Sequence, residues 1–511
     1  MKSNLAKSAL WVTFSEILFN LSGFVIHSVL GRFLGPADYG RYGIVITLTT
    51  MIIILIGNGI PTAMSKYISE YFETDARMVK AIKKQAVKLQ IIIIGTITLL
   101  FFLFIPLIAK LLGDPTLIPL FRISTLIIPA FAAASFYFSY YTGLHRFNLQ
   151  GTLKTLRSIF KIVFILGLAY FWKLEGSIVG YIVGPGAVFL VALLIDKFYV
   201  DKKLQTSVET QLIASLPEEP SFDWRKLTNY AWQVIVFFLA YELLISIDLY
   251  MVKGILQDDA LTGIYNGALT VGRIPYYIFY AMTIFLLPMI SKSTSQNNHV
   301  ETKKILSQSL RILLLLLVPM IVLMSIYAEP ILLDFYGKKY LSGALPMSIL
   351  EYGVGFLTIF YVMSFALNGA GKTKIVMWIS IFGFLINAAL NYILIKKYSI
   401  TGSAIATTIA SFIIMIWILY YLWKEFGVLI KIKTLAKTLF AAVLMYLASF
   451  LFSKGEIAFL GWSVLLFAFY LFILYVLREI KKEDLEIIKS LIFRKKKEEV
   501  EQELSGNEPG A

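Results

Sequence analysis

Apolar residues run along this chain in stretches of about twenty, separated by short polar segments rich in lysine and arginine. The hydrocarbon core of a bilayer is spanned by roughly 20 apolar residues of α-helix, so the pattern predicts fourteen membrane-spanning helices. The first is expected to be a retained helix, because it lacks the short apolar region and small-residue cleavage site of a signal peptide. The predicted spans are 8–30, 39–60, 89–109, 117–143, 156–174, 177–197, 227–252, 262–290, 306–328, 344–370, 375–397, 399–423, 435–453 and 456–480.

The composition supports an all-α polytopic membrane protein. Hydrophobic residues make up 58% of the 511 residues, charged residues only 15%, and the mean hydropathy is +0.76, whereas soluble proteins are about 25% charged. The absence of cysteine excludes disulfides, iron–sulfur clusters and thiolate zinc sites. The three histidines, His27, His145 and His299, are far apart, so we expect no metal site and no cofactor.

The net charge of +15 fits a membrane protein without invoking nucleic acid as a partner. With the N-terminus inside and fourteen spans, the inner segments hold 34 of the 47 lysines and arginines and the outer loops hold 10. This bias follows the positive-inside rule and predicts a cell-membrane protein with both termini cytoplasmic. The amphipathic segment 61–88 is expected along the inner interface, and 481–511 is expected to be a solvated charged tail.

Local patterns recur at a nearly constant offset, which predicts an internal duplication. Ser65-Lys66 recurs as Ser291-Lys292, and Gly176-Ser177 recurs as Gly402-Ser403, both 226 residues later. Other matches are Pro106 and Gly113 with Pro330 and Gly337, Gly143 with Gly369, and YGRYG around Gly40 with TGIYNG around Gly263. Six helices separate the repeats, so the two halves share one orientation.

The duplication predicts two pseudo-symmetric six-helix lobes. The N-lobe is 1–197, the inter-lobe cytoplasmic loop 198–226, and the C-lobe 227–423. An added helix pair follows at 424–480, before the charged tail 481–511. Two similar lobes around a central cavity suit a transporter that alternates between inward-open and outward-open states.

Three motifs resemble one transporter superfamily. LGRFLGPADYGRYGIV with GNGIPTAMSKYISEY is similar to the opening signature of the polysaccharide-exporter branch of the MATE-like (multidrug/oligosaccharidyl-lipid/polysaccharide) flippases. GRIPYYIFYAMTIFLLPMISKS resembles span eight of the lipid II flippases, and LNGAGKTK resembles the short inner turn after span ten of the family. The resemblance implies that the protein carries a polyprenyl-diphosphate-linked oligosaccharide from the cytoplasmic to the outer leaflet. It also implies a substrate-facing arginine at Arg273.

Ionisable residues deep in a membrane are costly and are candidate site residues. A cavity arginine at Arg273 suits a diphosphate through two parallel hydrogen bonds, and the alternative is an interhelical ion pair. Arg32, Arg41 and Arg122 lie near the outer ends of spans, where they either receive the diphosphate or anchor the interface. Lys161 either faces the cavity or snorkels to the inner interface.

A polar stripe on the first span is a second candidate feature. Glu16, Asn20, Gly23 and His27 share one helical face, which either faces the cavity, with Glu16 binding a coupling cation or pairing with a cavity cation, or forms a helix–helix seam. Glu242 and Asp248 are separated by about 120° around span seven, which argues against a paired-carboxylate site. Glu351 is a further candidate partner for a cavity cation.

Three functions compete at this point. The preferred one is a flippase for a lipid-linked oligosaccharide, acting as a monomer in the bilayer and driven by Na⁺, H⁺ or the membrane potential. The alternative is a MATE-type cation-coupled multidrug exporter, which Glu16 fits. A membrane glycosyltransferase or polymerase fits less well, since the outer loops are short and no catalytic motif is present. We therefore expect no enzymatic activity.

Overall fold

The computed structural model describes residues 2–72, 75–200, 222–428, 430–452 and 458–480. Within these ranges every regular element is helical, which confirms the all-α prediction. The elements are α1 (Lys2–Asn58), α2 (Ile60–Tyr71), α3 (Ala76–Leu111), α4 (Leu117–Ser124), α5 (Ile127–Gly143), α6 (Phe147–Ile195), η1 (Asp196–Val200), α8 (Trp224–Leu256), α9 (Asp259–Gly272), α10 (Ile274–Ser295), α11 (His299–Ile326), α12 (Ala328–Tyr336), η2 (Lys338–Gly343), α13 (Ala344–Gly369), α14 (Thr373–Phe426), α15 (Ile432–Ser449) and α16 (Ala458–Val476).

Nine helical stretches of the described chain are long and apolar enough to cross a membrane. This confirms a multi-pass membrane protein, whereas the number of fourteen crossings stays a prediction. Three of the nine are much longer than one crossing needs, with 41 residues in Phe14–Ile54 and 54 residues each in Phe147–Val200 and Thr373–Phe426. A helix of 54 residues extends about 80 Å, against a hydrocarbon core of about 30 Å.

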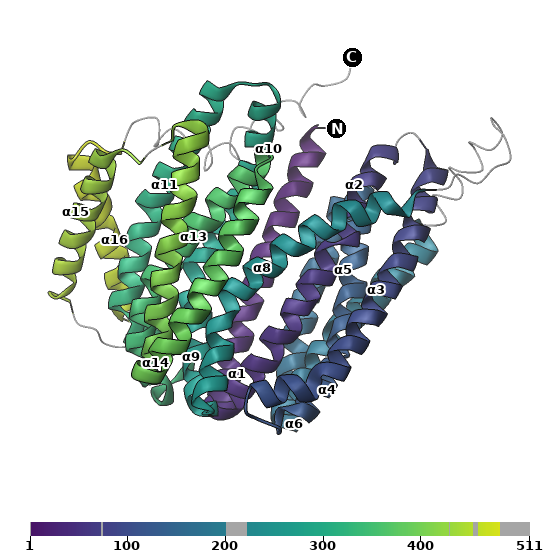
Figure 1. Cartoon of the computed structure of the whole chain (residues 1–511), viewed down its shortest axis with the longest axis horizontal. Helices are drawn as coiled ribbons and strands as arrows, with labels where there is room; N and C mark the ends of the chain where they lie inside the picture. The colour runs from purple at the N-terminus through teal and green to yellow at the C-terminus, as the bar shows by residue number, and fades with distance from the viewer. Residues whose placement is uncertain (1, 73–74, 201–221, 429, 453–457, 481–511) are drawn as a thin grey trace, which may run out of the picture.

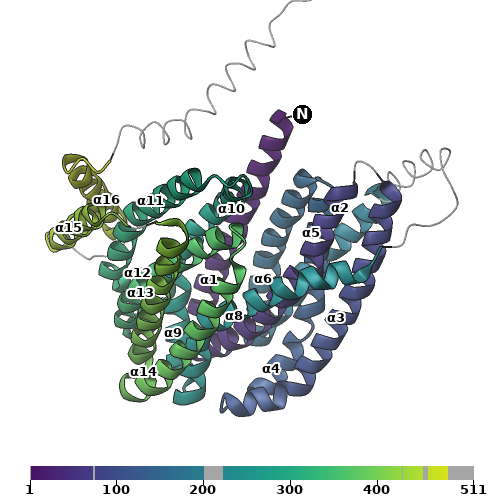
Figure 2. The same cartoon turned by 45° about the horizontal axis from the view of Figure 1, so that its top comes forward.

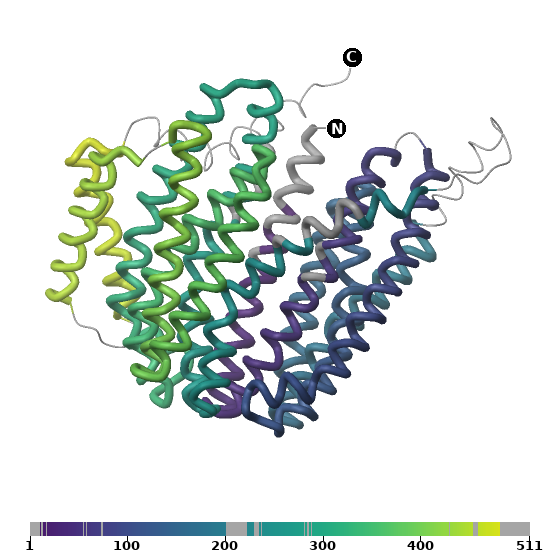
Figure 3. Tube along the Cα trace, viewed as in Figure 1, coloured from purple at the N-terminus to yellow at the C-terminus, as the bar shows by residue number. Residues whose placement is uncertain are grey.

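Each of these long helices contains a backbone break. Gly35 interrupts α1 with φ 76°, Lys173 interrupts α6 with φ 47°, and Ser399 interrupts α14 with φ 54°. Glycine adopts positive φ without steric cost, and the proline that follows Gly35 has no N–H for the helix ladder. The breaks fall where the sequence predicts the ends of adjacent spans, and Figure 3 traces α1 through the middle of the molecule and back.

The breaks in α6 and α14 repeat each other at the offset found in the sequence. Lys173 and Ser399 are 226 residues apart, as are the two glycines that follow them, Gly176 and Gly402. A Cβ on Gly176 would lie 2.0 Å from the carbonyl oxygen of Leu168, and a Cβ on Gly402 would lie 2.0 Å from that of Leu394. The same tight turn is therefore built twice, with glycine where the returning backbone approaches most closely.

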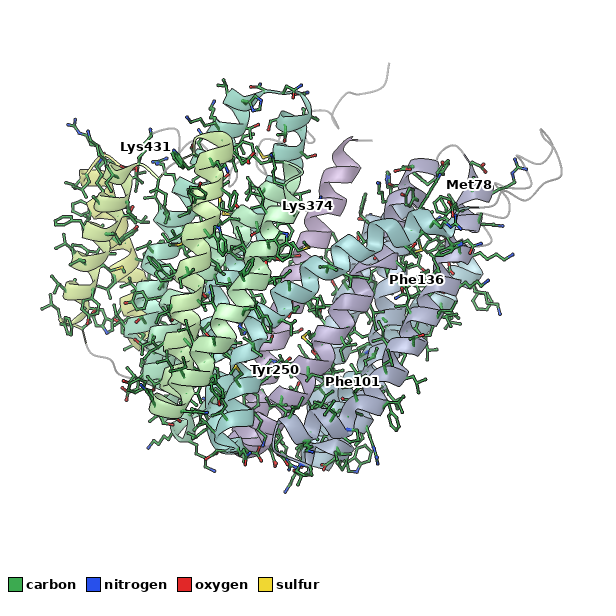
Figure 4. The ribbon with its side chains drawn as sticks, viewed as in Figure 1. Met78, Phe101, Phe136, Tyr250, Lys374 and Lys431 are labelled. Carbon is green, nitrogen blue, oxygen red and sulfur yellow. The ribbon has the colours of Figure 1, made fainter. Side chains whose placement is uncertain are left out.

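The N-terminal and C-terminal elements gather on opposite sides of the molecule (Figure 1). On one side α1 packs against α5 and α6, and on the other α14 packs against α8 and α13. The two groups meet where α1 contacts α8 and α9. Both views show α15 and α16 at the far edge of the C-terminal group (Figures 1 and 2). The side-chain view places Met78, Lys374 and Lys431, from three predicted inner segments, toward the same end (Figure 4).

A carboxylate at the end of α16 helps to attach the helix pair α15 and α16, which also packs against α11. Glu479, just after α16, accepts hydrogen bonds from Thr434 Oγ1 at 2.8 Å, Lys437 Nζ at 3.2 Å and Arg311 Nε at 3.3 Å. Burial alone would raise the pKa of Glu479, but these three donors hold that pKa below its ordinary value. Because Arg311 belongs to α11, this carboxylate joins the pair to the remainder of the bundle.

The segment 61–88, whose position along the inner interface stays a prediction, does not form a single helix. It is divided between α2 and the beginning of the 36-residue α3, and Asp75 caps α3 by accepting hydrogen bonds from the backbone N–H groups of Arg77 and Met78. The apolar side of α2, including Met64 and Ile68, is fully buried, and α2 packs against α3 and α5. The amphipathic pattern therefore marks a face that covers protein.

Candidate functional site

A cavity of about 560 Å³ lies between the two groups of helices. Its wall comes from α1, α5 and α6 on one side and from α8, α9 and α10 on the other. Ionisable and amide side chains on this wall are Asn20, His27, Gln150, Lys154, Arg157, Lys161, Glu242, Asn266 and Arg273. Such a set within a membrane protein is costly unless water or a polar ligand fills the space.

One face of α6 supplies three of the four cations. Gln150, Lys154, Arg157 and Lys161 are spaced by four, three and four residues, which aligns them along one side of the helix. Arg157 and Lys161 are each only 6% exposed. Lys161 therefore lies on the cavity wall and does not extend to the end of its helix.

Aromatic rings surround these two buried cations. The Arg157 guanidinium lies 4.4, 4.8 and 4.7 Å from the ring centres of Phe19, Phe131 and Phe138. Lys161 Nζ lies 4.8 Å from the ring centres of both Phe19 and Tyr181. A desolvated cation gains about 2 kcal/mol from a ring, so the rings offset a large part of the several kcal/mol that burial of each ion costs, but they do not neutralise its charge.

Neither cation has an anionic partner in contact within the part of the chain that the structure describes. Arg157 Nε has no hydrogen-bond partner, and the charge that acts on Arg157 from a distance is that of Glu16. Glu16 is itself in an ion pair with Lys154. The cavity therefore carries two buried positive charges that its own carboxylates do not neutralise directly.

The predicted stripe on the first span faces this cavity. Asn20, Gly23 and His27 lie on its wall, and Glu16 borders it through Lys154. His27 Nδ1 and the Tyr39 hydroxyl share a hydrogen bond of 2.9 Å, and the Tyr39 and Tyr336 hydroxyls lie 3.2 Å apart. This chain of polar groups leads from the cavity to α12, on the other side of the molecule.

Arg273 also lies on the cavity wall. It stands between α9 and α10, where it caps α9, and Pro275 follows in the first turn of α10. Its guanidinium donates to the backbone oxygen of Ile245 and is within electrostatic range of Glu242 and Asp248. This position is compatible with both predicted roles of Arg273. The guanidinium is on the cavity wall, where a ligand would bind, and it is also near carboxylates that could form an interhelical ion pair.

Glu242 and Asp248 face different surroundings, as their angular separation predicts. Glu242 lines the cavity, whereas Asp248 is buried between α8, α9 and α14. Asp248 accepts hydrogen bonds from the Tyr265 hydroxyl at 3.0 Å and from Thr407 Oγ1 at 3.3 Å. The two carboxylates do not form one site.

Besides Glu16, which borders the cavity through Lys154, four predicted residues lie off the cavity wall. Arg32 donates to backbone oxygens at the end of α12, with 3.0 Å to Phe335, because uncapped carbonyls at a helix C-terminus attract cations. Arg41 donates to Thr116 and lies 3.9 Å from the Asp259 carboxylate. Arg122 is exposed beside the Phe102 ring. Glu351 is fully buried behind Gly272, apart from every cavity cation.

The end of the bundle that carries Gly35 is closed by contacts between the two sides. A Cβ on Gly40 would lie 2.2 Å from the backbone oxygen of Asp259, and a Cβ on Gly263 would lie 1.8 Å from that of Pro36. Lys253 Nζ, on α8, is 2.8 Å from Asp114 Oδ2 and also contacts Asp259. We call these contacts the outer seal, after the predicted outer position of the turn at Gly35.

Lys154 and Arg157 are the residues that sequence reasoning missed. The predicted span five begins at residue 156, so Lys154 falls in the preceding inner segment and Arg157 is only the second residue of the span. Helix α6 begins nine residues earlier, at Phe147. The signal that could have found them is the spacing of Gln150, Lys154, Arg157 and Lys161, which repeats the polar pattern of the first span.

The sequence of this chain matches two protein-family profiles. A family profile described as "Polysaccharide biosynthesis protein" matches residues 5–294, more than half of the chain, and a MatE profile matches residues 234–393. Stage V sporulation protein B of Bacillus subtilis is 26% identical, over 96% of this chain and 100% of its own length. Lipid II flippase MurJ of the same organism is 23% identical over 80% of each chain.

The fold is shared with a solved structure. Lipid II flippase MurJ in an inward closed conformation superimposes with a TM-score of 0.71 at 18% identity, over 96% of this chain and 99% of that chain. At this identity the likeness concerns the fold alone. The sequence and fold comparisons together confirm the expected resemblance to the MATE-like superfamily.

Proposed function

Because the chain belongs to the polysaccharide biosynthesis protein family, we propose that it is a flippase for a polyprenyl-diphosphate-linked oligosaccharide. The similar proteins include a named lipid II flippase, which supports transport of a lipid-linked substrate. The observation that carries the proposal is the pair of buried cations, Arg157 and Lys161, that face the cavity without an anionic partner among the described residues. A diphosphate head group is an anion that satisfies both.

The charge balance of the cavity supports this cargo. Four cations, Lys154, Arg157, Lys161 and Arg273, face two carboxylates, Glu16 and Glu242, which leaves two positive charges. A diphosphate diester carries a charge of about −2, and charge-assisted bonds from arginine to phosphate oxygens are short and strong. The same surplus would repel the cationic compounds that a multidrug exporter carries.

The proposed architecture is the predicted one: fourteen crossings in two six-helix lobes, 1–197 and 227–423, with the pair 424–480 added. The recurrence of the α6 break in α14 supports the two-lobe reading. The breaks in α1, α6 and α14 each support two crossings from one long helix. We propose a monomer in the cell membrane, with both termini and the loop 198–226 on the cytoplasmic side.

Transport then alternates between two states. With the outer seal closed, the diphosphate and glycan enter the hydrated cavity from the cytoplasmic side while the lipid tail remains in the bilayer. Opening the seal releases the head group to the outer leaflet. Moving one charge through 100 mV is worth about 2.3 kcal/mol, so an inside-negative potential supplies on the order of 4–5 kcal/mol for a charge near −2.

The test is a flipping assay in proteoliposomes that contain a fluorescent polyprenyl-diphosphate-linked sugar. We expect potential-driven flipping by the wild type and at least tenfold slower flipping by R157Q and K161Q. The matched control is K397Q, which removes an exposed lysine of α14 and should flip at the wild-type rate. Wild-type protein that flips no lipid-diphosphate sugar, but expels cationic dyes, would overturn the flippase and favour the multidrug exporter.

A further inference from the structure

Glu351 differs from the other buried carboxylates of the C-terminal side. It is fully buried, about two turns into α13, and neither of its carboxylate oxygens has a hydrogen-bond partner in the described chain. Asp248, also buried, accepts hydrogen bonds from Leu249 N at 2.8 Å, Tyr265 and Thr407. Only a neutral carboxylic acid is tolerable without partners, because an isolated ionised group is very costly to bury.

No neighbouring charge explains this position. Among the described residues, the Glu351 carboxylate accepts no hydrogen bond and forms no ion pair. Titratable groups at and around the α9–α10 break are engaged elsewhere. Arg273, after α9, interacts with Asp248 and Glu242; Tyr265 of α9 interacts with Asp248; and Tyr276 of α10 interacts with Tyr241.

The carboxyl lies against the break between two cavity helices. A Cβ on Gly272 would lie 3.3 Å from Glu351 Oε1, and Gly272 is the last residue of α9. The next residue is Arg273, whose Cα is about 3.8 Å further along the backbone. The Arg273 guanidinium points to the cavity and donates to the backbone oxygen of Ile245, so the backbone of this break stands between the guanidinium and Glu351.

We propose that Glu351 is a proton-binding site that couples the outer seal to Arg273. While the seal is closed, Glu351 holds a proton. When the α9–α10 break moves and the seal opens, Glu351 releases that proton to water and its carboxylate pairs with the Arg273 guanidinium. The pairing withdraws one cation from the cavity, which weakens the hold on an anionic head group in the state that must release it.

The direction of the pH effect follows from proton counting. The closed state binds one more proton than the open state, so acid favours the closed state and alkali favours the open state. For one linked proton the ratio of closed to open molecules changes by up to about tenfold per pH unit. The inference rests on the proposed alternation of states but not on the identity of the cargo.

The experiment measures the opening and closing of the outer seal in the absence of any cargo. The chain has no cysteine, so spin labels on K110C and K339C, two exposed positions at the outer end of either side, report one distance. In nanodiscs, pulsed EPR should show a larger closed population at pH 6 than at pH 8. E351Q should abolish this dependence and remain mostly closed, E351D should retain it, and the control E301Q, at an exposed glutamate, should match the wild type.

Two results would overturn the proposal: E351Q with the wild-type pH dependence, or a population that responds to sodium and not to pH. If E351Q fails to fold, infrared spectra of the wild type and of E351D decide the matter. A carbonyl band of a protonated carboxylic acid that is present at pH 6, weakens at pH 8 and shifts in E351D supports the site, because the bands of other buried carboxyls do not shift in this variant. The absence of any band that responds to E351D rules the site out. Because no flipping is measured, these outcomes are independent of the proteoliposome assay.

Discussion

Lys253 makes the strongest single ionic contribution to the outer seal, so its substitution is the sharpest test of that region. Its side chain is 2% exposed, and it joins Asp114 of the N-terminal side to Asp259 of α9. In K253M the methionine keeps most of the volume, but the two carboxylates lose their shared cation and repel each other. Burial alone would raise the pKa of Asp114, yet hydrogen bonds from Lys253 and Thr116 hold it below its ordinary value.

The size of the effect follows from the exposure of these carboxylates. Removing one partner of a fully buried ion pair costs about 3–5 kcal/mol. Asp114 and Asp259 are 12% and 29% exposed at their side chains, so water recovers part of that cost. We expect a loss of about 1–3 kcal/mol from the closed state, which corresponds to a shift of roughly 5- to 150-fold in the ratio of closed to open molecules.

The spin labels on K110C and K339C measure this ratio of closed to open molecules. K253M should show a clearly larger open population than the wild type at pH 7, and K397M, which removes an exposed lysine of α14, should not. A K253M protein with a closed population equal to or above that of the wild type would refute the assignment of Lys253 to the seal. Because the pKa of Asp114 is lowered from its ordinary value by Lys253 and Thr116, Asp114 does not change its charge between pH 6 and pH 8, where Glu351 is tested.

Two further predictions concern packing. G40A should open the seal in the same label assay, because its Cβ would lie 2.2 Å from the Asp259 backbone oxygen, whereas G23A on the cavity wall, with no atom within 4 Å of its Cβ, should leave the seal closed. Glu479 has a lowered pKa, so its contacts with Thr434, Lys437 and Arg311 are stabilising above the ordinary glutamate pKa of about 4.3 and are lost as pH falls below it. Thermal melts in detergent should show a drop in Tm between pH 6 and pH 3.5 that is smaller in E479Q than in the wild type, since other carboxylates such as Asp114 also lose their ion pairs in acid.

Much of the helical pattern can be predicted, because a membrane span must form its backbone hydrogen bonds within its own segment. Apolar runs of about twenty residues become helices wherever they occur, and Gly35, Lys173 and Ser399 break the chain where adjacent runs meet. The exact helix ends are harder to predict. Helix α6 continues beyond its apolar run to Phe147, because backbone hydrogen bonds do not depend on the polarity of the side chains.

Part of the candidate site was predictable for an energetic reason. Polar groups within a membrane span are costly to bury, so they are candidate site residues. The structure brings four of these candidates to one cavity or to its border: Glu16, His27, Lys161 and Arg273. Arg32 and Arg41 satisfied the same rule but lie at helix ends, where nearby carbonyl and carboxylate oxygens bind them. The identity of these oxygen partners depends on tertiary contacts, which cannot be predicted from the spacing of residues along the chain.

The contact between Gly40 and Gly263 has a further consequence for how this protein arose. Their repeats are 223 residues apart, so on the proposed duplication each glycine is the counterpart of the other. In a symmetric dimer, a residue at the two-fold axis touches its own copy, and a mutation there acts on both surfaces at once. In a single fused chain the two copies can differ. At the next matching position, a Cβ on Gly43 would lie 2.4 Å from the Asn266 side chain, so the small residue of one repeat leaves the space that the larger residue of the other repeat occupies.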